Sequence, residues 1–262
     1  MDLGLKDLVA LVTASSKGLG RAAAQQLAGE GARVVICARG TEALEAARDE
    51  IAALGGDVLA LSADLTQPDA AQALVDATLE RFGQLDILIA NAGGPPPGGF
   101  LALDEAAWES AIELTFMSFV RLCYAAIPAL KRSTHGSILA STSVSVKQPL
   151  PNLVLSNSLR LGVTGAVKSL ADELGPMGIR VNAICPGWAR TARVDHLLED
   201  RAQRNGTSVE EEASAVAAAV PLGRIASPDE FARAATFLVS PAASYITGVS
   251  LLVDGGMYRG AM

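Results

Sequence analysis

The stretch VALVTASSKGLG, residues 9–20, decides the fold of this chain. Its apolar run Val9–Thr13 predicts a buried strand, which leads into a turn that contains Gly18 and Gly20. A helix is expected over Leu19–Gly29. A glycine-rich turn at this place lets the backbone approach a pyrophosphate, and the helix N-terminus offers free N–H groups. The stretch predicts a dinucleotide site, although two glycines also fit a simple tight turn.

The same alternation of short apolar strands and longer Ala- and Leu-rich helices continues outward from this stretch. Further strands are expected at 33–37, 58–61, 86–90, 137–142, 180–184 and 250–253, and helices at 41–54, 69–82, 104–130, 152–175 and 229–239. Continuously apolar strands that alternate with helices predict a parallel sheet with helices on both faces. Right-handed crossovers then make the doubly wound α/β fold the expected architecture, as one domain over residues 1–262.

One segment departs from this alternation. Residues 188–220 are charged and helical in pattern, and they lie between a Pro-Gly turn and the next regular unit. A long insertion there is typical of a lid over a site.

Composition excludes several classes of function. The net charge of −7 argues against a nucleic-acid groove or an anionic membrane surface. Cys37, Cys123 and Cys185 are scattered in apolar runs, which predicts reduced thiols in a cytoplasmic protein. His135 and His196 are far apart, so no metal site is expected. We find neither a signal peptide nor an uninterrupted apolar run of membrane-spanning length.

The glycine-rich turn supplies the first candidate cofactor-binding residues. They are Thr13, Ser15, Ser16, Lys17, Gly18, Leu19 and Gly20. Ala14 stands where a first glycine is usual. Its methyl group is tolerable only if the backbone there does not need a positive φ.

The end of the second predicted strand indicates the type of dinucleotide. An acidic residue there would bind the ribose hydroxyls of NAD, but this chain has Ala38 and Arg39. Arg39 together with Lys17 could neutralise a 2′-phosphate, so NADP(H) is preferred, with NAD(H) as the alternative. The other interpretation is two solvated basic side chains.

Two later strand ends add candidates at the same edge of the sheet. Asp64 and Leu65 follow the third strand and are placed to meet an adenine, although Asp64 could instead cap a helix. Asn91, Ala92 and Gly93 form a small-residue turn after the fourth strand. Ligands of open α/β sheets bind at this carboxyl edge.

With these motifs in order, the chain resembles the short-chain dehydrogenase/reductase family over essentially its whole length. The motifs are TASSKGLG at 13–20, Asp64, NAG at 91–93, Ser143, Pro186-Gly187 with Thr191, PLGR at 221–224, ITG at 246–248 and VDGG at 253–256. The resemblance implies a single-domain Rossmann-type fold with a seven-stranded parallel sheet, NAD(P), and a homotetramer or homodimer. The chain looks most like the 3-oxoacyl-acyl-carrier-protein reductases.

The catalytic positions depart from that family. A family Tyr-x-x-x-Lys pair falls at Ser156 and Arg160, and the assisting asparagine falls at Thr115, while Ser143 matches the family serine. A serine hydroxyl is a far weaker acid than a phenol, and arginine is protonated at any ordinary pH. Arg160 could still bind the ribose hydroxyls or an anionic substrate. Lys147 is another candidate proton source, unless it is simply solvated.

The segment after the sixth strand completes the predicted site. By resemblance, Pro186 and Gly187 bend the chain over the cofactor and Thr191 binds the nicotinamide carboxamide; otherwise Thr191 caps a helix. Arg190, Arg193 and His196 could meet an anionic substrate or face water.

Two functions therefore compete. One is an NADP(H)-dependent oxidoreductase acting on a small carbonyl or alcohol with altered proton delivery. The other is a non-catalytic NADP-binding scaffold or sensor. Isomerase or lyase chemistry on the same fold is a third alternative.

Overall fold

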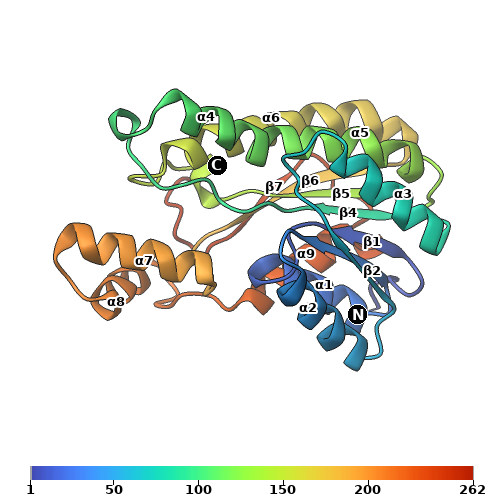
Figure 1. Ribbon diagram of the computed structural model, residues 1–262, viewed down its shortest axis with the longest axis horizontal. Helices are drawn as coiled ribbons and strands as arrows, with labels where there is room; N and C mark the ends of the chain where they lie inside the picture. The colour runs from blue at the N-terminus through green and yellow to red at the C-terminus, as the bar shows by residue number, and fades with distance from the viewer. Residues whose placement is uncertain (1, 262) are drawn as a thin grey trace.

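Seven parallel strands form the central sheet of the computed structural model, which describes residues 2–261. Their order is β3-β2-β1-β4-β5-β6-β7. The strands are β1 Val9–Val12, β2 Arg33–Ala38, β3 Val58–Ser62, β4 Ile87–Ala90, β5 Ser137–Ser141, β6 Arg180–Pro186 and β7 Ser250–Val253. The order reverses between β1 and β4, so a crevice is expected at the carboxyl ends of these two strands (Figure 1).

Helices cover both faces of the sheet and make the predicted three-layer, doubly wound fold (Figure 1). One face carries α1 Gly18–Gly29, α2 Thr41–Ala53 and α9 Pro228–Val239. The other carries α3 Ala70–Phe82, α4 Glu105–Ala111, α5 Ser118–Leu130 and α6 Val154–Leu174. The single-domain α/β architecture is therefore confirmed.

Alternation along β1 explains the two cores. Ala10 and Val12 pack with α1, α2 and α9, whereas Leu11 packs with α3, α5 and α6. All three residues are fully buried, which is why this strand is apolar on both faces. Burial of the Leu11 and Val12 side chains contributes roughly 1.5–3 kcal/mol each.

The helix that carries Ser156 and Arg160 begins later than the sequence predicts. It starts at Val154 rather than Asn152, because Asn152 has a φ of 61° and cannot continue a right-handed helix. Leu153 instead forms a parallel bridge with Gly98, and the Gly98 N–H donates to the Asn152 carbonyl oxygen at 2.8 Å. This pairing joins the loop 93–99 to the start of α6.

The long helix predicted over 104–130 is continuous but changes its winding. Between α4 and α5 it contains a π-helical segment, Ile112–Met117, which includes Thr115. Single π-helical turns are frequent at functional sites.

No membrane-spanning segment is expected from the sequence, but this helical run meets the length and hydropathy of one. Glu105–Leu130 is long and apolar enough to cross a membrane, but 44% of its most apolar window is buried. It packs on α3 and α6 as one layer of the fold. Packing in the core accounts for its apolar character.

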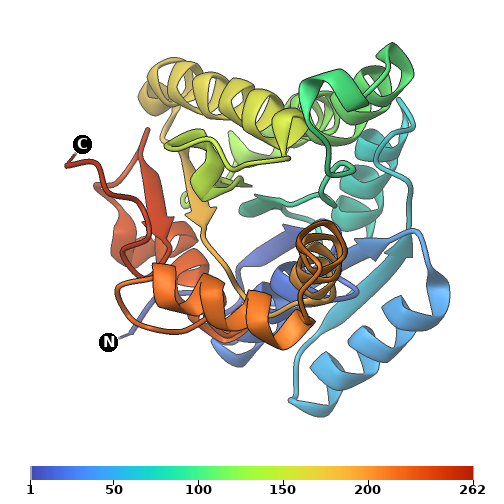
Figure 2. The ribbon, with the colours of Figure 1, turned by 90° about the vertical axis from the view of Figure 1, so that its left-hand side faces the viewer.

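Residues 188–220 stand over the carboxyl edge of the sheet as two helices, α7 Ala192–Asn205 and α8 Val209–Ala219 (Figure 2). They share a small apolar cluster of Val194, Leu198 and Val216, against which Trp188 packs. The predicted lid is thus a helical hairpin with its own core.

The glycine-rich turn holds a strained residue. Ala14 has a φ of 47°, so the backbone does adopt the left-handed region at the position where glycine is usual. Gly20 is required for close approach, since a Cβ there would lie 2.5 Å from the Ala14 carbonyl oxygen. A non-glycine residue in this conformation costs about 1–2 kcal/mol.

Ala14→Gly should therefore stabilise the chain. Glycine removes the backbone strain of the folded state, and this gain exceeds the stability lost because glycine increases the conformational entropy of the unfolded chain. We therefore expect a net gain of about 0.5–1 kcal/mol in the free energy of unfolding. Urea denaturation measures it. Ala46→Gly, on the exposed face of α2, is the control and should lose about 1 kcal/mol. Equal losses for both variants would contradict the assignment of strain to Ala14.

Candidate active site

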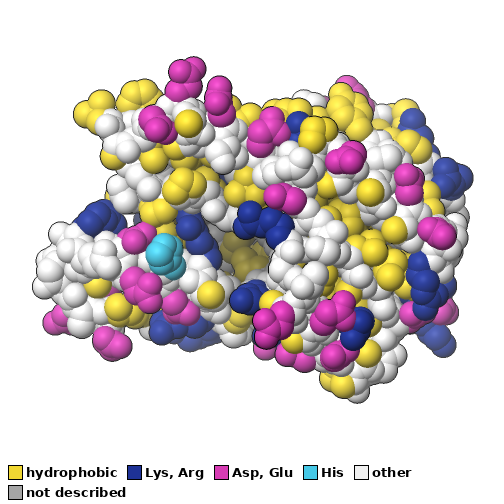
Figure 3. Space-filling model, in the orientation of Figure 1, with side chains coloured by type: hydrophobic (Ala, Val, Ile, Leu, Met, Phe, Trp, Pro, Cys, Tyr) yellow, Lys and Arg dark blue, Asp and Glu magenta, His cyan; other side chains and the backbone are white. Residues whose placement is uncertain are grey.

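A cleft of about 280 Å³ opens at the carboxyl ends of β1, β4, β5 and β6. Its walls are the turns that follow these strands, the first turns of α6 and the start of the lid. Its lining includes Lys17, Gly18, Leu19, Asn91, Ala92, Gly93, Ser143, Ser156, Arg160, Pro186, Gly187 and Thr191. Figure 3 shows the molecule hollowed between lid and body, with basic side chains around the hollow. The fold therefore brings together most of the predicted site.

The end of the cleft at α1 is shaped for a dinucleotide phosphate. Lys17 is the N-cap of α1, forms no side-chain capping hydrogen bond, and is followed by no acidic residue in the first turn. The first N–H groups of the helix are left for a ligand, and the helix dipole favours an anion there. A Cβ on Gly18 would meet the Thr191 methyl group at 3.2 Å, so only glycine leaves this approach open.

Other predicted residues of the turn brace it from within. Thr13 Oγ1 donates to the Asn91 carbonyl oxygen at 2.6 Å, and Asn91 Nδ2 donates to the Ala14 carbonyl oxygen at 3.2 Å. Ser15 Oγ donates to the Val12 carbonyl oxygen at 2.7 Å. Thr13 and Ser15 are completely buried and do not line the cleft. Their side chains fix the positions of β1 and β4, and their contribution to a ligand is through the backbone they hold.

The adenosine end predicted from the sequence lies outside the cleft proper. Arg39 is exposed, and among residues 2–261 no carboxylate forms an ion pair with it or with Lys17. Ser16 is half-buried beside them, and Leu65 is buried. Arg39 acts electrostatically on Asp64 without pairing with it. Two cations that form no ion pair fit a phosphate on the adenosine ribose.

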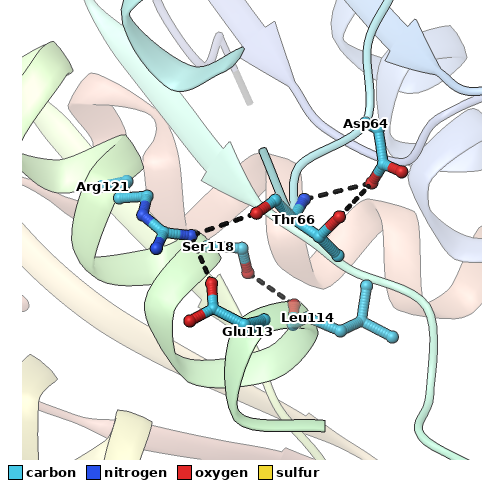
Figure 4. A network of polar contacts seen from close by, with 6 residues as sticks. All are labelled: Asp64, Thr66, Glu113, Leu114, Ser118 and Arg121. Carbon is cyan, nitrogen blue, oxygen red and sulfur yellow. Dashed lines mark hydrogen bonds and ion pairs between the residues drawn. The ribbon is translucent and has the colours of Figure 1, made fainter. Parts of the chain in front are cut away.

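Asp64 is held in a polar network that extends to α5 and to the π-helical segment before it (Figure 4). Its Oδ1 accepts from the Thr66 N–H at 3.1 Å and from Thr66 Oγ1 at 2.9 Å, and these bonds lower the pKa of Asp64. Arg121 Nη1 donates to the Thr66 carbonyl oxygen at 3.3 Å and to Glu113 Oε2 at 2.6 Å. The network ties the turn after β3 to the π-helical segment.

Two hydroxyl groups face the cleft near β5. Ser143 Oγ accepts a hydrogen bond from the Ser145 N–H at 3.1 Å, which leaves its own proton available to a ligand. Ser156 is 9% exposed, and its hydroxyl forms no hydrogen bond with any residue from 2 to 261. Both can donate to a carbonyl oxygen placed in the cleft.

Arg160 lies one helical turn beyond Ser156 and is anchored to the sheet. Its Nη1 donates to the carbonyl oxygens of Ser141 at 2.9 Å and Thr142 at 3.2 Å. Burial lowers the pKa of Arg160 to about 10, and the nearby positive charge of Arg193 acts in the same direction. At neutral pH it remains a cation, and its other guanidinium N–H groups are left for the cleft.

Thr115 is separate from these groups. It is buried in the π-helical segment and does not line the cleft. Its Oγ1 has no hydrogen-bond partner among residues 2–261. A buried hydroxyl without a partner is uncommon and suits an internal water.

The segment after β6 closes the cleft from the lid side. Pro186 ends β6, and a Cβ on Gly187 would lie 2.9 Å from Asp254 Cα, so the chain passes closely there. Thr191 caps α7, since its Oγ1 accepts from the Val194 N–H at 3.3 Å. It still lines the cleft. Capping is therefore one role of Thr191, and its methyl group packs against the phosphate end.

Some residues that line the cleft were not predicted from the sequence. Leu150 and Leu153 form an apolar wall opposite the lid, and Gly94 and Thr142 also line the cleft. Leu150 and Leu153 belong to the stretch QPLPNL. The prolines of this stretch predict a loop, but they do not indicate that its leucines line the cleft. Of the cations considered on the lid, Arg193 lines the cleft, whereas Arg190 and His196 do not.

The chain is similar to several known reductases. A family model described as Enoyl-(Acyl carrier protein) reductase matches residues 13–258. The 3-oxoacyl-acyl-carrier-protein reductase of Escherichia coli is 34% identical over 250 residues, which is 95% of this chain and 97% of that protein. The L-sorbose reductase of Gluconobacter frateurii, solved with NADPH and L-sorbose, has a TM-score of 0.94 at 32% identity, covering 99% of this chain and 100% of that one.

A further similar structure is that of a short chain oxidoreductase. An NADPH-bound short chain oxidoreductase from Pseudomonas aeruginosa PAO1, described as containing an atypical catalytic center, has a TM-score of 0.88 at 33% identity. The alignment covers 98% of this chain and 100% of that one.

A buried carboxylate, in addition to the apolar cluster, links the two helices of the lid. Glu212 accepts hydrogen bonds from Asn205 Nδ2 at 2.6 Å, Arg201 Nε at 2.9 Å and Thr207 Oγ1 at 2.9 Å. These bonds lower the pKa of Glu212 to about 2. Because the folded-state pKa is lowered, the ionised group stabilises the lid above its ordinary pKa, and this contribution is lost as the pH falls toward about 2.

Glu212→Gln should therefore loosen the lid at neutral pH without unfolding the sheet. We expect faster proteolysis within residues 192–219 at pH 7. The native chain should also lose lid structure between pH about 4.5 and 2, as reported by Trp188 fluorescence in a Trp108→Phe background. The variant should lack that step. Glu210→Gln removes the same charge from the exposed face of α8 and should change neither result; if it behaves like Glu212→Gln, the assignment to the buried carboxylate is wrong.

Proposed function

The chain belongs to the short-chain dehydrogenase/reductase family, and on this premise we propose that it is an NADP(H)-dependent oxidoreductase that reduces a small carbonyl compound. The observation that carries the proposal is the cleft in which an uncapped helix N-terminus faces the two hydroxyls of Ser143 and Ser156. The groups that would bind the dinucleotide phosphate and the groups that would bind the carbonyl oxygen thus line the same cleft.

NADP(H) is proposed over NAD(H) because of charge. Arg39 and Lys17 form no ion pair with an acidic side chain within residues 2–261, so a 2′-phosphate would meet two available cations. Two of the solved relatives, the L-sorbose reductase and the Pseudomonas aeruginosa oxidoreductase, carry NADPH. When bound, the nicotinamide supplies the hydride.

The side chains of this chain supply position and a proton. Ser143 donates a hydrogen bond to the carbonyl oxygen and orients it. Ser156 then donates its proton to the alkoxide that forms, and water returns a proton to Ser156. The cation of Arg160, one turn away, stabilises the negative charge that passes through Ser156.

This arrangement favours reduction over oxidation. An alkoxide is a strong base and takes a proton even from a weakly acidic hydroxyl such as that of Ser156. Alcohol oxidation needs a base that accepts a proton near neutral pH, and neither Ser156 nor Arg160 is one. We therefore propose a reductase with little dehydrogenase activity at pH 7.

The test is NADPH oxidation with a panel of small ketones, ketoacyl thioesters and quinones, together with a direct titration of NADPH binding. The proposal predicts binding and turnover, with the alcohol as product. NADPH binding without turnover of any panel member would support the alternative, a non-catalytic NADP-binding scaffold or sensor.

Ser156→Ala should lower kcat for reduction by about 10²-fold, because it removes the proton donor. The Kd for NADPH should stay unchanged. Ser158→Ala, on an exposed part of the same helix, is the control and should keep full activity. If Ser156→Ala retains native kcat, the proton comes from elsewhere and Lys147 becomes the leading source.

Arg39→Ala should raise the Kd for NADPH roughly 10-fold and leave the Kd for NADH unchanged, because a charge-assisted contact to one phosphate is lost. Fluorescence titration with both dinucleotides measures this. Arg48→Ala, on the exposed side of α2 where Arg48 pairs with Asp49, should change neither value. An equal loss for both dinucleotides would show that Arg39 does not read the 2′-phosphate.

We also propose that the protein is a cytoplasmic homotetramer. Apolar side chains are exposed on the long helical layer at Ile112, Tyr124 and Leu161, and near the edge strand β7 at Val249 and Leu251. Two separate patches suit two dyad-related interfaces. The three cysteines are buried and unbridged, which suits a reducing compartment.

A further inference from the structure

Two arginines share a cleft that has no acidic residue in its described lining. Arg160 and Arg193 both line it, and none of the lining residues within 2–261 is Asp or Glu. Neither arginine takes part in an ion pair within that range. The chain as a whole carries a net charge of −7, so this local excess of positive charge is not a general property of its surface.

The Arg193 guanidinium is held in place at the mouth of the loop 93–99. Its Nη2 donates to the Pro95 carbonyl oxygen at 2.6 Å. A Cβ on Gly94 would come 2.8 Å from Arg193 Nε, so the absence of a side chain at Gly94 makes room for the guanidinium. No other hydrogen bond to residues 2–261 uses the remaining N–H groups of its fork.

The electrostatics of the pair are unfavourable without a ligand. Each guanidinium is partly or wholly removed from water, which lowers the pKa of both, and the charge of Arg193 lowers the pKa of Arg160 further. The charge of Asp200 acts in the opposite direction on the pKa of Arg193, but the two side chains form no ion pair within residues 2–261. Bringing two like charges into one cavity costs free energy that an anion would recover.

We propose that Arg193 binds an anionic group of the substrate, so that the preferred substrates are small carbonyl compounds that carry a carboxylate. A planar guanidinium fork matches a carboxylate, with Arg160 adding positive charge from the opposite side of the cleft. In the proposed function the same cleft of about 280 Å³ also receives the dinucleotide, which favours a small substrate. This inference rests on the proposed reductase function and narrows its substrate class.

A phosphate of the dinucleotide is the other possible anion. It already has a place at Lys17 and the N-terminus of α1. Arg193 instead lies against Gly94 and Pro95, beyond the Asn91–Gly93 turn, and acts electrostatically on Arg160. Its position is therefore on the side of Ser143 and Ser156, where the carbonyl would bind.

The experiment compares acetoacetate with methyl acetoacetate, which have the same carbonyl but differ in charge. The native chain should show a higher kcat/KM for the acid. Arg193→Gln should lower kcat/KM for the acid by roughly 10- to 100-fold and change the ester little. Arg193→Lys, which keeps the charge, should recover part of the preference. Arg190→Gln is the matched control, because Arg190 is on the same segment, outside the cleft, and pairs with Asp195 at 2.9 Å.

A binding measurement separates this inference from the proposed function. Calorimetric titration of acetoacetate into the chain saturated with NADP⁺ should give a Kd that rises in Arg193→Gln and not in Arg190→Gln. That result supports the inference even if no carbonyl is turned over. If Arg193→Gln lowers kcat/KM equally for acid and ester, Arg193 only holds the lid in place. If Arg193→Gln weakens the binding of NADPH itself, the anion that Arg193 binds is a phosphate of the dinucleotide. Either outcome, or the absence of acetoacetate binding, would overturn the inference.

Discussion

The contact between the Arg160 guanidinium and the carbonyl oxygens of Ser141 and Thr142 is the constraint on which the site depends. It joins α6 to the carboxyl end of β5 and so fixes Ser156 relative to Ser143. It also brings a buried cation to the cleft, where no Asp or Glu is among the lining residues that the structure describes. A buried charge of this kind is tolerated when dipoles and a ligand compensate it. The site is therefore built to receive oxygen atoms that carry or develop negative charge.

The scaffold around this contact is independent of the altered chemistry. Thr13 and Asn91 bind the β1 and β4 turns to each other, and Arg121 links the turn after β3 to the long helix. These bonds keep the nucleotide end open whether or not a tyrosine stands at position 156. A Pseudomonas aeruginosa relative with the same fold carries NADPH and is described as containing an atypical catalytic center. The nucleotide cleft therefore does not depend on which residues occupy positions 156 and 160.

The sequence predicted the sheet and its helical layers because apolar strands and Ala-rich helices alternate with little ambiguity. The glycine-rich turn likewise located the cleft. Three features were not predictable, since each arises from contacts between distant segments. Arg160 turns its guanidinium onto β5, Asn152 delays the start of α6, and Arg193 fits beneath Gly94. The sequence pattern predicts which residues share a face of a helix. It does not predict which distant carbonyl group or loop a long side chain contacts.

The central claim is that this cleft transfers hydride to a carbonyl despite the missing tyrosine and lysine. Its most direct measurement uses NADPH deuterated at the transferable nicotinamide position, with acetoacetate or another small ketone and mass analysis of the products. We predict one deuterium in the alcohol, in the native chain and in the Ser158→Ala variant, and a much slower transfer in Ser156→Ala. Tight binding of the deuterated dinucleotide with no deuterium in any product would contradict the account.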